Sequence, residues 1–284
     1  MLTVLDIIKK TTGFLEGKEV ENARLNAEHL VGHALGLARM QLYLQFERPL
    51  EEEDLEKIRP LVRRRGQREP LQYIMGTTEF FGVELKVDSR ALIPRPETEY
   101  LAAQIVEKLP QVPHSILDLG TGSGALALSL AQHYIDAKVL ATDVSADAVA
   151  LAKENAAALN LADRVEVRES DWFAAIEDDA TYDLIVSNPP YLSEQETEET
   201  LTEVKDFEPR IALTPGGSES GLEPYEIIIR EAHNYLAPGG LLAIETGIAQ
   251  REALEEMLTR SEYARHEFVA DLTERERFVF TWKD

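Results

Sequence analysis

A short polar motif directly after an apolar run is the stretch of this sequence best suited to chemistry. The motif is Asn188-Pro189-Pro190-Tyr191, and the run before it, Leu184–Val186, is typical of a buried strand. Proline lacks a backbone N–H, so a central strand has to end where the two prolines begin. Asn188 is therefore expected at the carboxyl end of a strand, where open α/β sheets bind their ligands.

The carboxamide oxygen of Asn188 and the backbone carbonyl of Pro189 form a pair of hydrogen-bond acceptors. A planar NH2 group needs two acceptors for its two hydrogens, and the ring of Tyr191 offers a flat face to the same group. Asn188 and Pro189 are therefore the candidate catalytic residues, and the candidate substrate-binding residues are Asn188, Pro189, Pro190 and Tyr191. The alternative is a strand that ends in an ordinary Asn-Pro turn.

A glycine-rich turn upstream is a second candidate site. An apolar strand pattern at Ile116–Leu119 leads into it, and a helix pattern follows. Glycines allow unusual backbone angles and close ligand approach, and a helix N-terminus offers unpaired N–H groups. The spacing is Gly-x-Gly-x-Gly, and such a turn alone is a weak signal. The candidate cofactor-binding residues here are Gly120, Thr121, Gly122, Ser123 and Gly124.

The next two predicted strands also end in residues that suit a nucleoside. Asp143 follows the second strand, about twenty residues after the glycine turn, where an acid accepts hydrogen bonds from ribose hydroxyls. Asp171 and Trp172 follow the third strand; the first can accept from an exocyclic amine and the second can cover a purine. Trp172 could instead be a core aromatic. We add these three residues and Asn188 to the candidate cofactor-binding set.

The composition limits the class of protein and of ligand. With 284 residues, 44 % of them apolar, the chain is long enough for one large or two smaller domains. There is no cysteine, which excludes disulfides and thiolate metal sites and fits a reducing cytoplasm. The net charge of −23 opposes binding to a nucleic-acid backbone, so no direct nucleic-acid partner is expected.

Other features indicate neither a targeting segment nor a metal. The residues after Met1 lack the basic and apolar regions of a secretory signal, and no window reaches the length of a membrane-spanning helix. His29 and His33 are four residues apart but have no third ligand, so packing or a surface position is favoured. We therefore expect a cytoplasmic protein with no membrane contact and no metal site.

The second part of the chain must position the candidate residues. From Ser115 onward, predicted strands and helices alternate, which is typical of an α/β fold with a mostly parallel sheet. The expected strands are Ser115–Leu119, Lys138–Thr142, Arg164–Arg168, Asp183–Ser187, Leu241–Thr246, Arg265–Ala270 and Arg277–Trp282. The expected helices are Gly124–His133, Ala146–Leu159, Pro224–Leu236 and Ala249–Thr259. The polar stretch 193–224 is predicted to be a long functional or mobile loop.

The chain before this alternation has a different character. Helical patterns cover Leu5–Thr12, Asn22–Leu35 and Glu51–Arg65. The first is expected to break near Gly13 and Gly17, alternation around Gly82 predicts a β-hairpin, and a further helix is expected from Pro96 to about Leu109. We therefore expect a helical bundle at 1–70, a hairpin linker at 71–92 and an α/β domain at 93–284.

Several motifs of the sequence, taken together, carry a family resemblance. They are Glu69-Pro70-Leu71-Gln72-Tyr73-Ile74, Leu92-Ile93-Pro94-Arg95-Pro96-Glu97-Thr98-Glu99, Asp118-Leu119-Gly120-Thr121-Gly122-Ser123-Gly124, Asp143, Asp171-Trp172, Asn188-Pro189-Pro190-Tyr191, Phe207-Glu208-Pro209-Arg210 and Glu245-x-Gly247-x-x-Gln250. In this order they resemble the HemK/PrmC family, the peptide chain release factor glutamine methyltransferases. Asn-Pro-Pro-Tyr also occurs in adenine methyltransferases, whereas the Pro-Arg-Pro stretch singles out this family.

The resemblance implies a fold, a reaction and roles for residues. The fold is a class I methyltransferase, Rossmann-like with a mostly parallel seven-stranded sheet, after a helical domain that helps hold the substrate. The reaction moves a methyl group from S-adenosyl-L-methionine to the side-chain nitrogen of the glutamine in the Gly-Gly-Gln motif of class 1 peptide chain release factors, leaving S-adenosyl-L-homocysteine. Carried over, Gly120 to Gly124 and Asp143 hold the cofactor with Trp172 near its adenine, and Asn188 to Tyr191 hold the glutamine, with Asn188 also near the cofactor.

Two other classes of function stay open on the residues alone. An adenine-N6 DNA or RNA methyltransferase could use the same acceptor pair on a flipped base, although the acidic charge counts against it. The second open class is a non-catalytic protein that only binds the cofactor. The intact Asn188 and the intact glycine turn count against this class. One departure from the family lies near the C-terminus, where Asp271-Leu272 is followed by Thr273 instead of the usual glycine.

Overall fold

The computed structural model describes residues 2–109, 111–217 and 219–284. The chain divides into two compact units, which are described separately below. The smaller unit holds the residues up to Thr77 together with Leu201–Phe207, and the larger unit holds Thr78–Thr200 and Glu208–Asp284. No helix within the described ranges is long and apolar enough to cross a membrane.

The smaller unit is helical. Its helices are α1 (Val4–Glu16), α2 (Ala23–Leu35), α3 (Arg39–Leu44), α4 (Glu52–Gly66), α5 (Leu71–Met75) and α10 (Thr202–Lys205). Two buried apolar clusters join α1, α2 and α4, one around Ile8 and Val31 and the other around Leu15 and Leu30. The sequence correctly placed α2 and α4, because their apolar stripes and terminal residues are regular.

Three details of this unit correct the sequence prediction. Helix α1 does not break near Gly13 but continues through it to Glu16, because nothing crowds that position and the capping box of Thr3 and Asp6 fixes the first turn. Helix α3 was not predicted. Residues Leu71–Met75, expected in the hairpin linker, form α5 instead, and this helix ends at Gly76 in the left-handed region.

A buried ionic cluster holds residues 201–207 in the helical unit. Glu203 on α10 accepts hydrogen bonds from Arg65 at 2.8 Å and from Arg68 at 2.6 and 2.7 Å. Arg65, which is 6 % exposed, also donates to Asn26 Oδ1 at 2.8 Å. One member of the basic run Arg63-Arg64-Arg65 at the end of α4 therefore lies inside the unit.

The larger unit is built on a seven-stranded sheet in the order β5-β4-β3-β6-β7-β9-β8. Its strands are β3 (Ser115–Leu119), β4 (Lys138–Asp143), β5 (Val165–Glu169), β6 (Tyr182–Ser187), β7 (Leu236–Glu245), β8 (Arg265–Ala270) and β9 (Glu276–Trp282). Strands β3 to β7 pair in parallel, and β9 runs antiparallel to β7 and β8. The mostly parallel seven-stranded sheet predicted from the sequence is confirmed. A two-stranded hairpin, β1 (Thr77–Phe80) and β2 (Val83–Lys86), precedes it.

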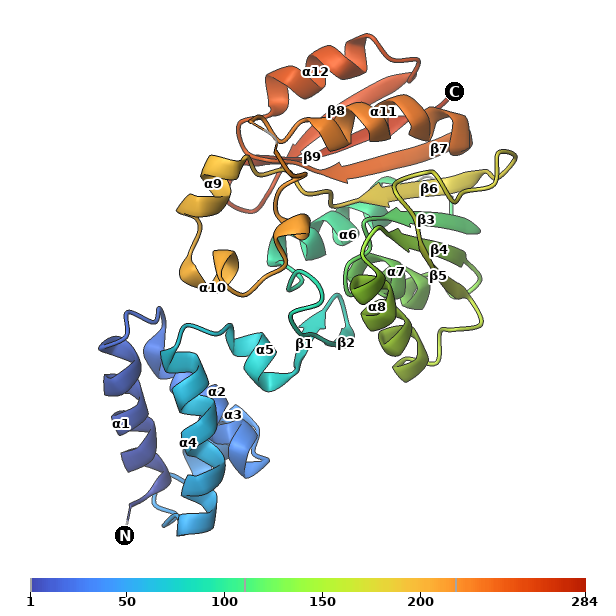
Figure 1. Cartoon of the computed structure of the whole chain (residues 1–284). Coiled ribbons are helices and arrows are strands. Elements are labelled where there is room, and N and C mark those ends of the chain that lie inside the picture. The colour runs from blue at the N-terminus through green and yellow to red at the C-terminus, as the bar shows by residue number, and fades with distance from the viewer. Residues whose placement is uncertain (1, 110, 218) are drawn as a thin grey trace. The chain divides into compact units, whose positions relative to one another are not determined.

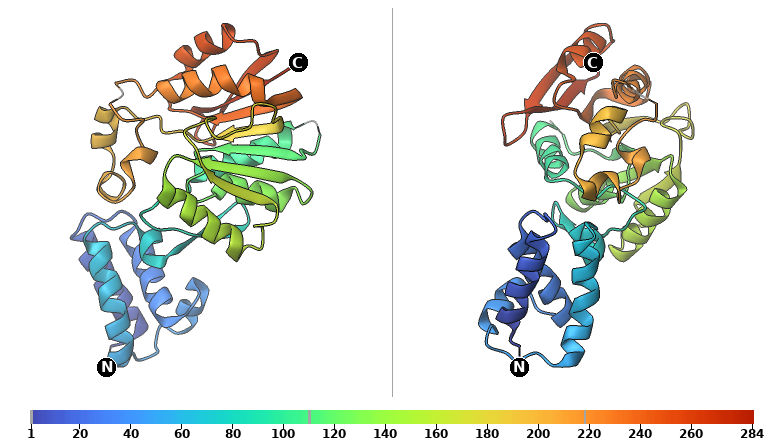
Figure 2. Two further views of the ribbon diagram at one scale, coloured as in Figure 1. Left: turned by 45° about the vertical axis from the view of Figure 1, so that its right-hand side comes forward. Right: turned by 60° about the vertical axis from the view of Figure 1, so that its left-hand side comes forward.

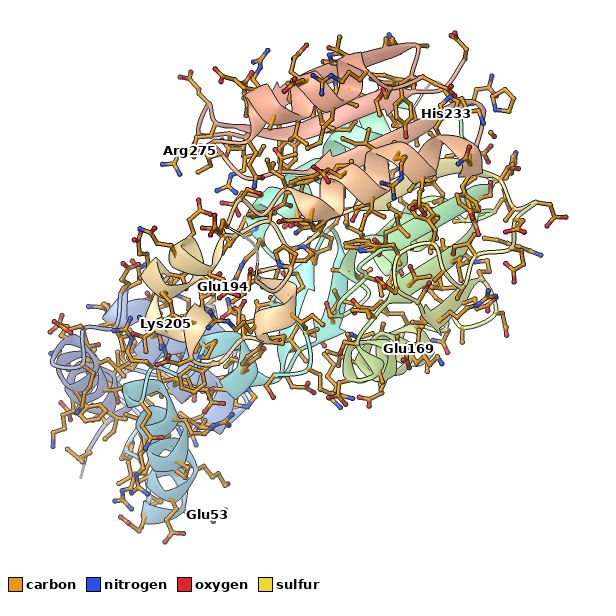
Figure 3. All side chains as sticks on the ribbon, turned by 45° about the horizontal axis from the view of Figure 1, so that its top comes forward. Glu53, Glu169, Glu194, Lys205, His233 and Arg275 are labelled. Atoms are coloured by element: carbon orange, nitrogen blue, oxygen red, sulfur yellow. The ribbon has the colours of Figure 1, made fainter. Side chains whose placement is uncertain are left out.

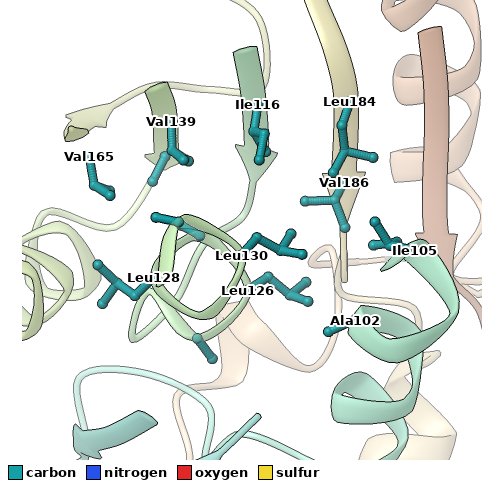
Figure 4. Packing of buried hydrophobic residues seen from close by; sticks show 14 of the residues in the cluster. Ala102, Ile105, Ile116, Leu126, Leu128, Leu130, Val139, Val165, Leu184 and Val186 are labelled. Carbon is teal, nitrogen blue, oxygen red and sulfur yellow. The ribbon is translucent and has the colours of Figure 1, made fainter. Parts of the chain in front are cut away.

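Helices cover both faces of this sheet (Figures 1 and 2). One face carries α6 (Pro96–Lys108), α7 (Ala125–His133) and α8 (Ala146–Ala158), and the other carries α11 (Glu223–Tyr235) and α12 (Arg251–Thr259). Figure 4 shows the first layer, where Leu126 and Leu130 of α7 lie beneath Ile116, Leu184 and Val186 of the central strands. Both strand faces are apolar because both are covered, which is why the strands read as continuous hydrophobic runs.

The polar segment predicted as a long loop contains short helices. They are α9 (Glu194–Glu199), α10 and the 3-10 turn η1 (Arg210–Ala212), and Figure 3 labels Glu194 and Lys205 on the first two. Helix α9 begins with a capping box in which Ser193 and Glu196 satisfy each other's backbone N–H groups. Arg210 pairs with Glu194 and Glu198 of α9, so the segment is held by its own charges.

The turn between β8 and β9 is closed by the side chain of Asp271. Asp271 Oδ1 accepts hydrogen bonds from the backbone N–H groups of Thr273 and Arg275 at 2.7 and 3.1 Å (Arg275 is labelled in Figure 3). Glu274 takes the left-handed conformation, with φ at 63°. An aspartate that caps its own turn thus supports a backbone geometry that glycine adopts more easily.

We expect Glu203→Ala to destabilise the helical unit by roughly 3 kcal/mol, because it leaves the buried Arg65 guanidinium without its carboxylate. Glu53→Ala is the matched control, since it removes an exposed ion pair with Lys57 that contributes at most about 1 kcal/mol. Urea unfolding followed by circular dichroism gives both values. Equal losses in the two variants would show that the cluster has no special role.

Candidate active site

A cavity of about 310 Å³ opens at the carboxyl ends of the central strands in the larger unit. The loops after β3, β4, β5 and β6 line one side of it. The predicted site residues that line the cavity are Gly120, Thr121, Gly122, Ser123, Asp143, Asp171, Trp172, Asn188 and Pro190. The structure therefore brings together the glycine turn, the two acids, the tryptophan and the asparagine that the sequence selected.

Three predicted residues lie outside the set that lines the cavity. Gly124 is the N-cap of α7, with φ at 86°, and a Cβ there would lie 2.9 Å from Leu128, so this glycine serves close packing. Pro189 is buried. Tyr191 points its hydroxyl at Glu245 Oε1, 3.2 Å away, and burial raises its pKa well above the ordinary value.

The glycine turn has the backbone that its sequence predicts. Gly120 and Gly122 have φ of 71° and 56°, where residues with a side chain are disfavoured. Thr121 N–H donates to the Thr142 carbonyl at 2.8 Å, and Gly122 N–H donates to Asp143 Oδ2 at 2.9 Å. Asp143 Oδ1 accepts from Ser145 N–H at 2.9 Å, so this acid joins the turn after β3 to the start of α8.

Asp118, which the sequence analysis did not select, lies at the floor of the cavity. It is 1 % exposed, and its Oδ2 accepts from Thr121 Oγ1 at 2.6 Å and from Ala127 N–H at 3.1 Å. Its Oδ1 has no hydrogen-bond partner among the residues that the structure describes. Burial raises the pKa of Asp118 to about 7, although the two hydrogen bonds lower it.

The free oxygen of Asp118 provides a test of fit for S-adenosyl-L-methionine. A buried carboxylate oxygen without a partner favours a cationic donor, and the cofactor carries an ammonium group and a sulfonium. Trp172 offers an apolar face that suits an adenine ring, and Asp143 offers a carboxylate that suits ribose hydroxyls. The residues present therefore match the charge and the ring of this cofactor.

Trp172 both packs against the core and lines the cavity. It is half-buried against the cluster around Phe173 and Tyr235, and it also lines the cavity. Its backbone has φ of 48°, a costly conformation for a bulky residue. Ser170 Oγ holds it there by donating to the Trp172 carbonyl at 2.8 Å, so the turn fixes the ring at the cavity wall.

A chain of hydrogen bonds leads from Asn188 into the protein. Asn188 Nδ2 donates to Thr98 Oγ1 at 2.9 Å, and Thr98 Oγ1 donates to Glu245 Oε2 at 2.6 Å. On the far side, Tyr191 donates to Glu245 Oε1 and accepts from Arg277 at 3.3 Å. Thr98 comes from the first turn of α6 and Glu245 from the end of β7, beside β6.

Glu245 is a buried acid at the centre of this chain. It is 1 % exposed, and burial raises its pKa to about 7, while Thr98, Arg277 and Tyr191 oppose the rise. The sequence analysis missed Thr98 and Glu245 as site residues. Both residues belong to the motifs quoted for the family resemblance, and membership in those motifs was the sequence signal that could have identified them.

A salt bridge beside the cavity joins two more of the motifs that carry the family resemblance. Arg95, just before α6, donates to Glu208 Oε2 at 2.6 Å, and Glu208 is 6 % exposed. The neighbouring Pro94 and Ile211 line the cavity. Gln250 similarly holds the end of the Asn-Pro-Pro-Tyr motif, because its side chain donates a hydrogen bond to the Tyr191 carbonyl at 3.0 Å.

The sequence matches two family models and many curated relatives. Residues 6–76 match the PrmC N-terminal domain, and residues 98–219 match the methyltransferase small domain. The release factor glutamine methyltransferase of Geobacter sulfurreducens is 44 % identical, with 91 % of this chain and 89 % of that protein covered. The enzyme of the same name from Salmonella typhimurium is 39 % identical, with 92 % of each covered.

Solved structures share the fold at low sequence identity. A methyltransferase from Pyrococcus furiosus aligns with a TM-score of 0.52 at 20 % identity, over 70 % of this chain and 88 % of that one. The catalytic domain of human Mettl16 aligns with a TM-score of 0.56 at 18 % identity, over 72 % of this chain and 76 % of that one. At these identities the match concerns the fold alone.

The sheet with its antiparallel β9 and the cavity above the glycine turn define a class I methyltransferase domain. Its relatives cover nearly the whole chain at well above 30 % identity. The chain belongs to the family of release factor glutamine methyltransferases.

We expect the affinity for S-adenosyl-L-homocysteine, which keeps the ammonium group of the cofactor, to rise with pH as Asp118 ionises, because burial raises the pKa of Asp118 to about 7. The bound ammonium favours the carboxylate, so binding below that pH must first release its proton. In Asp118→Asn the affinity should fall about tenfold or more at pH 7.5 and lose this pH dependence, as expected for losing a charged hydrogen bond worth about 1.5–3 kcal/mol.

Isothermal titration calorimetry between pH 5.5 and 7.5 measures the affinity. This range lies below the pKa of an α-amino group, about 7.7–8.0, so the ammonium group of the ligand stays charged. Asp143→Asn is the control, because it removes another acid of the cavity. It should weaken binding, while the affinity still rises with pH through Asp118. A wild-type affinity that does not change over this range would remove Asp118 from the ammonium site.

Proposed function

We propose that this protein transfers the methyl group of S-adenosyl-L-methionine to the side-chain amide nitrogen of a glutamine in a class 1 peptide chain release factor, in its Gly-Gly-Gln motif. Family membership supports the reaction class and the substrate. The observation that carries the proposal is the fixed carboxamide of Asn188 in the cavity. Its Nδ2 is committed to Thr98, so the atom it offers to a ligand is the acceptor Oδ1.

The residues of the cavity divide between the two substrates. Asp118, the glycine turn, Asp143 and Trp172 would hold S-adenosyl-L-methionine, which supplies an electrophilic methyl group on a positively charged sulfur. Asn188 Oδ1 and the Pro189 carbonyl would accept the two amide hydrogens of the substrate glutamine. In this arrangement Tyr191 supports the motif from behind, because its hydroxyl is engaged by Glu245 and Arg277.

The task of the protein is mainly positional. An amide nitrogen is a weak nucleophile, because its lone pair is delocalised into the carbonyl group. Two acceptors that hold its hydrogens in place fix the direction of the nitrogen, and such orientation can supply as much as about 7–11 kcal/mol of a barrier. The residues proposed to contact the two substrates are neutral or anionic, which suits a cofactor that carries positive charge.

We further propose that the helical unit, which the sequence places at residues 1–70, contributes to holding the release factor. The PrmC N-terminal domain model matches this region, which supports the proposal. Binding energy from remote parts of a substrate serves to orient its reacting group. An adenine methyltransferase remains the competing function, because the same acceptor pair fits an adenine amine, but the net charge of −23 opposes a nucleic-acid substrate.

We expect Asn188→Ala to lower the turnover number by at least a hundredfold while changing cofactor affinity much less. The substitution removes an acceptor that acts on the nucleophile, and mis-oriented amides react poorly. Methyl transfer to purified release factor, together with calorimetry of cofactor binding, measures both. A normal rate in the folded variant would refute the acceptor-pair mechanism.

We expect an intact release factor to be methylated at least tenfold faster than a short Gly-Gly-Gln peptide, with the new methyl group on the glutamine side chain. Only the intact protein offers contacts away from the reacting residue. Adenine in DNA should stay unmodified even at low salt, where electrostatic binding is strongest. Mass spectrometry after incubation with each substrate decides. Methyladenine alongside unmodified glutamine would favour the competing function.

A further inference from the structure

Asn188, Thr98 and Glu245 form a relay in which the direction of each hydrogen bond is fixed by the next. An ionised carboxylate only accepts, so Thr98 must donate its single hydroxyl hydrogen to Glu245 across their 2.6 Å contact. The Thr98 oxygen then accepts from Asn188, and the only donor of that side chain is Nδ2, 2.9 Å away. The carboxamide is therefore locked with Oδ1 on the opposite side.

We propose that Glu245 is a positioning residue that acts through Thr98 to set the orientation of the Asn188 carboxamide. The inference rests on the proposed function, because it assigns Glu245 the task of presenting an acceptor to the NH2 group of the substrate. Glu245 itself stays away from the reacting atoms. Thr98 is the link, and it is 5 % exposed in the first turn of α6.

The orientation matters because the two faces of a carboxamide have opposite character. With Oδ1 toward the cavity, Asn188 accepts a hydrogen from the substrate amide. With Nδ2 toward the cavity, two NH2 groups would face each other, and neither could accept. Asparagine alone cannot choose between these states, since the flip exchanges groups of nearly the same size.

The surroundings of Glu245 keep it suited to this task. Tyr191 donates to its other oxygen, and Arg277 lies behind that tyrosine, so a hydrogen-bond donor and a positive charge are provided on one side. Glu97 on α6 adds a like charge, and Tyr225 on α11 adds a second buried phenol. Burial raises the pKa of both tyrosines far above neutrality, so neither ionises in the range where Glu245 does.

Protonation of Glu245 would reverse the relay. A neutral carboxyl group donates to Thr98, which then directs its own hydrogen toward Asn188 and favours the flipped carboxamide. Because burial raises the pKa of Glu245 to about 7, the protonated form gains population below neutral pH. The orientation of Asn188 should therefore respond to pH through Thr98.

The test compares Thr98→Val, which has the same shape without the hydroxyl, with Thr98→Ser, which keeps the hydroxyl. We expect Thr98→Val to lower kcat on intact release factor about tenfold with cofactor affinity within twofold of wild type. Thr98→Ser should keep kcat within about threefold. Wild-type kcat in Thr98→Val, or equal losses in both variants, would overturn the proposal.

A second readout needs no methyl transfer. In protein labelled with 15N-asparagine, the side-chain NH2 signal of Asn188, assigned by its loss in Asn188→Asp, should shift between pH 5.5 and 8 in wild type and in Thr98→Ser. The shift should vanish in Thr98→Val and in Glu245→Gln. A persistent shift in Glu245→Gln would remove Glu245 as its source.

The two readouts separate the proposals. If wild type leaves the release factor unmodified while the Asn188 signal depends on Thr98 and Glu245, the proposed function fails and the positioning role stands. If wild type methylates the release factor and the pH dependence of the Asn188 signal is unchanged in Thr98→Val and Glu245→Gln, the proposed function stands and the positioning role is wrong.

Discussion

The register of the parallel strands is the constraint on which the site depends. Leu119 at the end of β3 pairs with Thr142 of β4 and with Ser187 of β6, and Ser187 pairs with Ile244 of β7. Parallel strands end at a common edge, so the residues that follow these four strands meet there. A shift of one residue in any of them would turn its end toward the opposite face. The glycine turn, Asp143, Asn188 and Glu245 are neighbours for this reason.

The site also concentrates acids that the fold keeps from water. Asp118 and Glu245 are each 1 % exposed, and burial raises the pKa of both to about 7. In the unfolded chain they would ionise near 3.8 and 4.5. The folded state therefore binds protons that the unfolded state has released, and the stability that these protonated groups contribute is lost as pH rises toward 7. Such a cost in stability beside a cavity is typical of residues retained for function.

The segment between α9 and α11 connects the two units in an unusual way. Residues 201–207 belong to the helical unit, where Glu203 meets Arg65 and Arg68, while Ile211 and Ala212 return to line the cavity of the larger unit. The chain thus enters the helical unit a second time, immediately before it contributes to the site. The length of this segment has a structural reason, because it must provide both an ionic anchor and part of a cavity wall.

The sequence by itself determined the local structure and the order of the motifs. Apolar runs located the strands of the sheet, except that β7 begins at Leu236 and not at the predicted Leu241. Glycines located the turn after β3, and prolines located the end of β6, because each of these signals depends on neighbouring residues. Helices α3 and α5 escaped notice, since they are only 6 and 5 residues long and lack a full amphipathic period.

Only the tertiary structure decided which side chains became partners. Thr98 and Glu245 are 147 residues apart, and Arg65 and Glu203 are 138 apart. Their contacts follow from the strand order and from helix packing, which no spacing along the chain specifies. The same holds for Asp118, which the sequence placed inside an apolar strand pattern. Its free oxygen became visible only when the folded chain left it at the floor of the cavity without a donor.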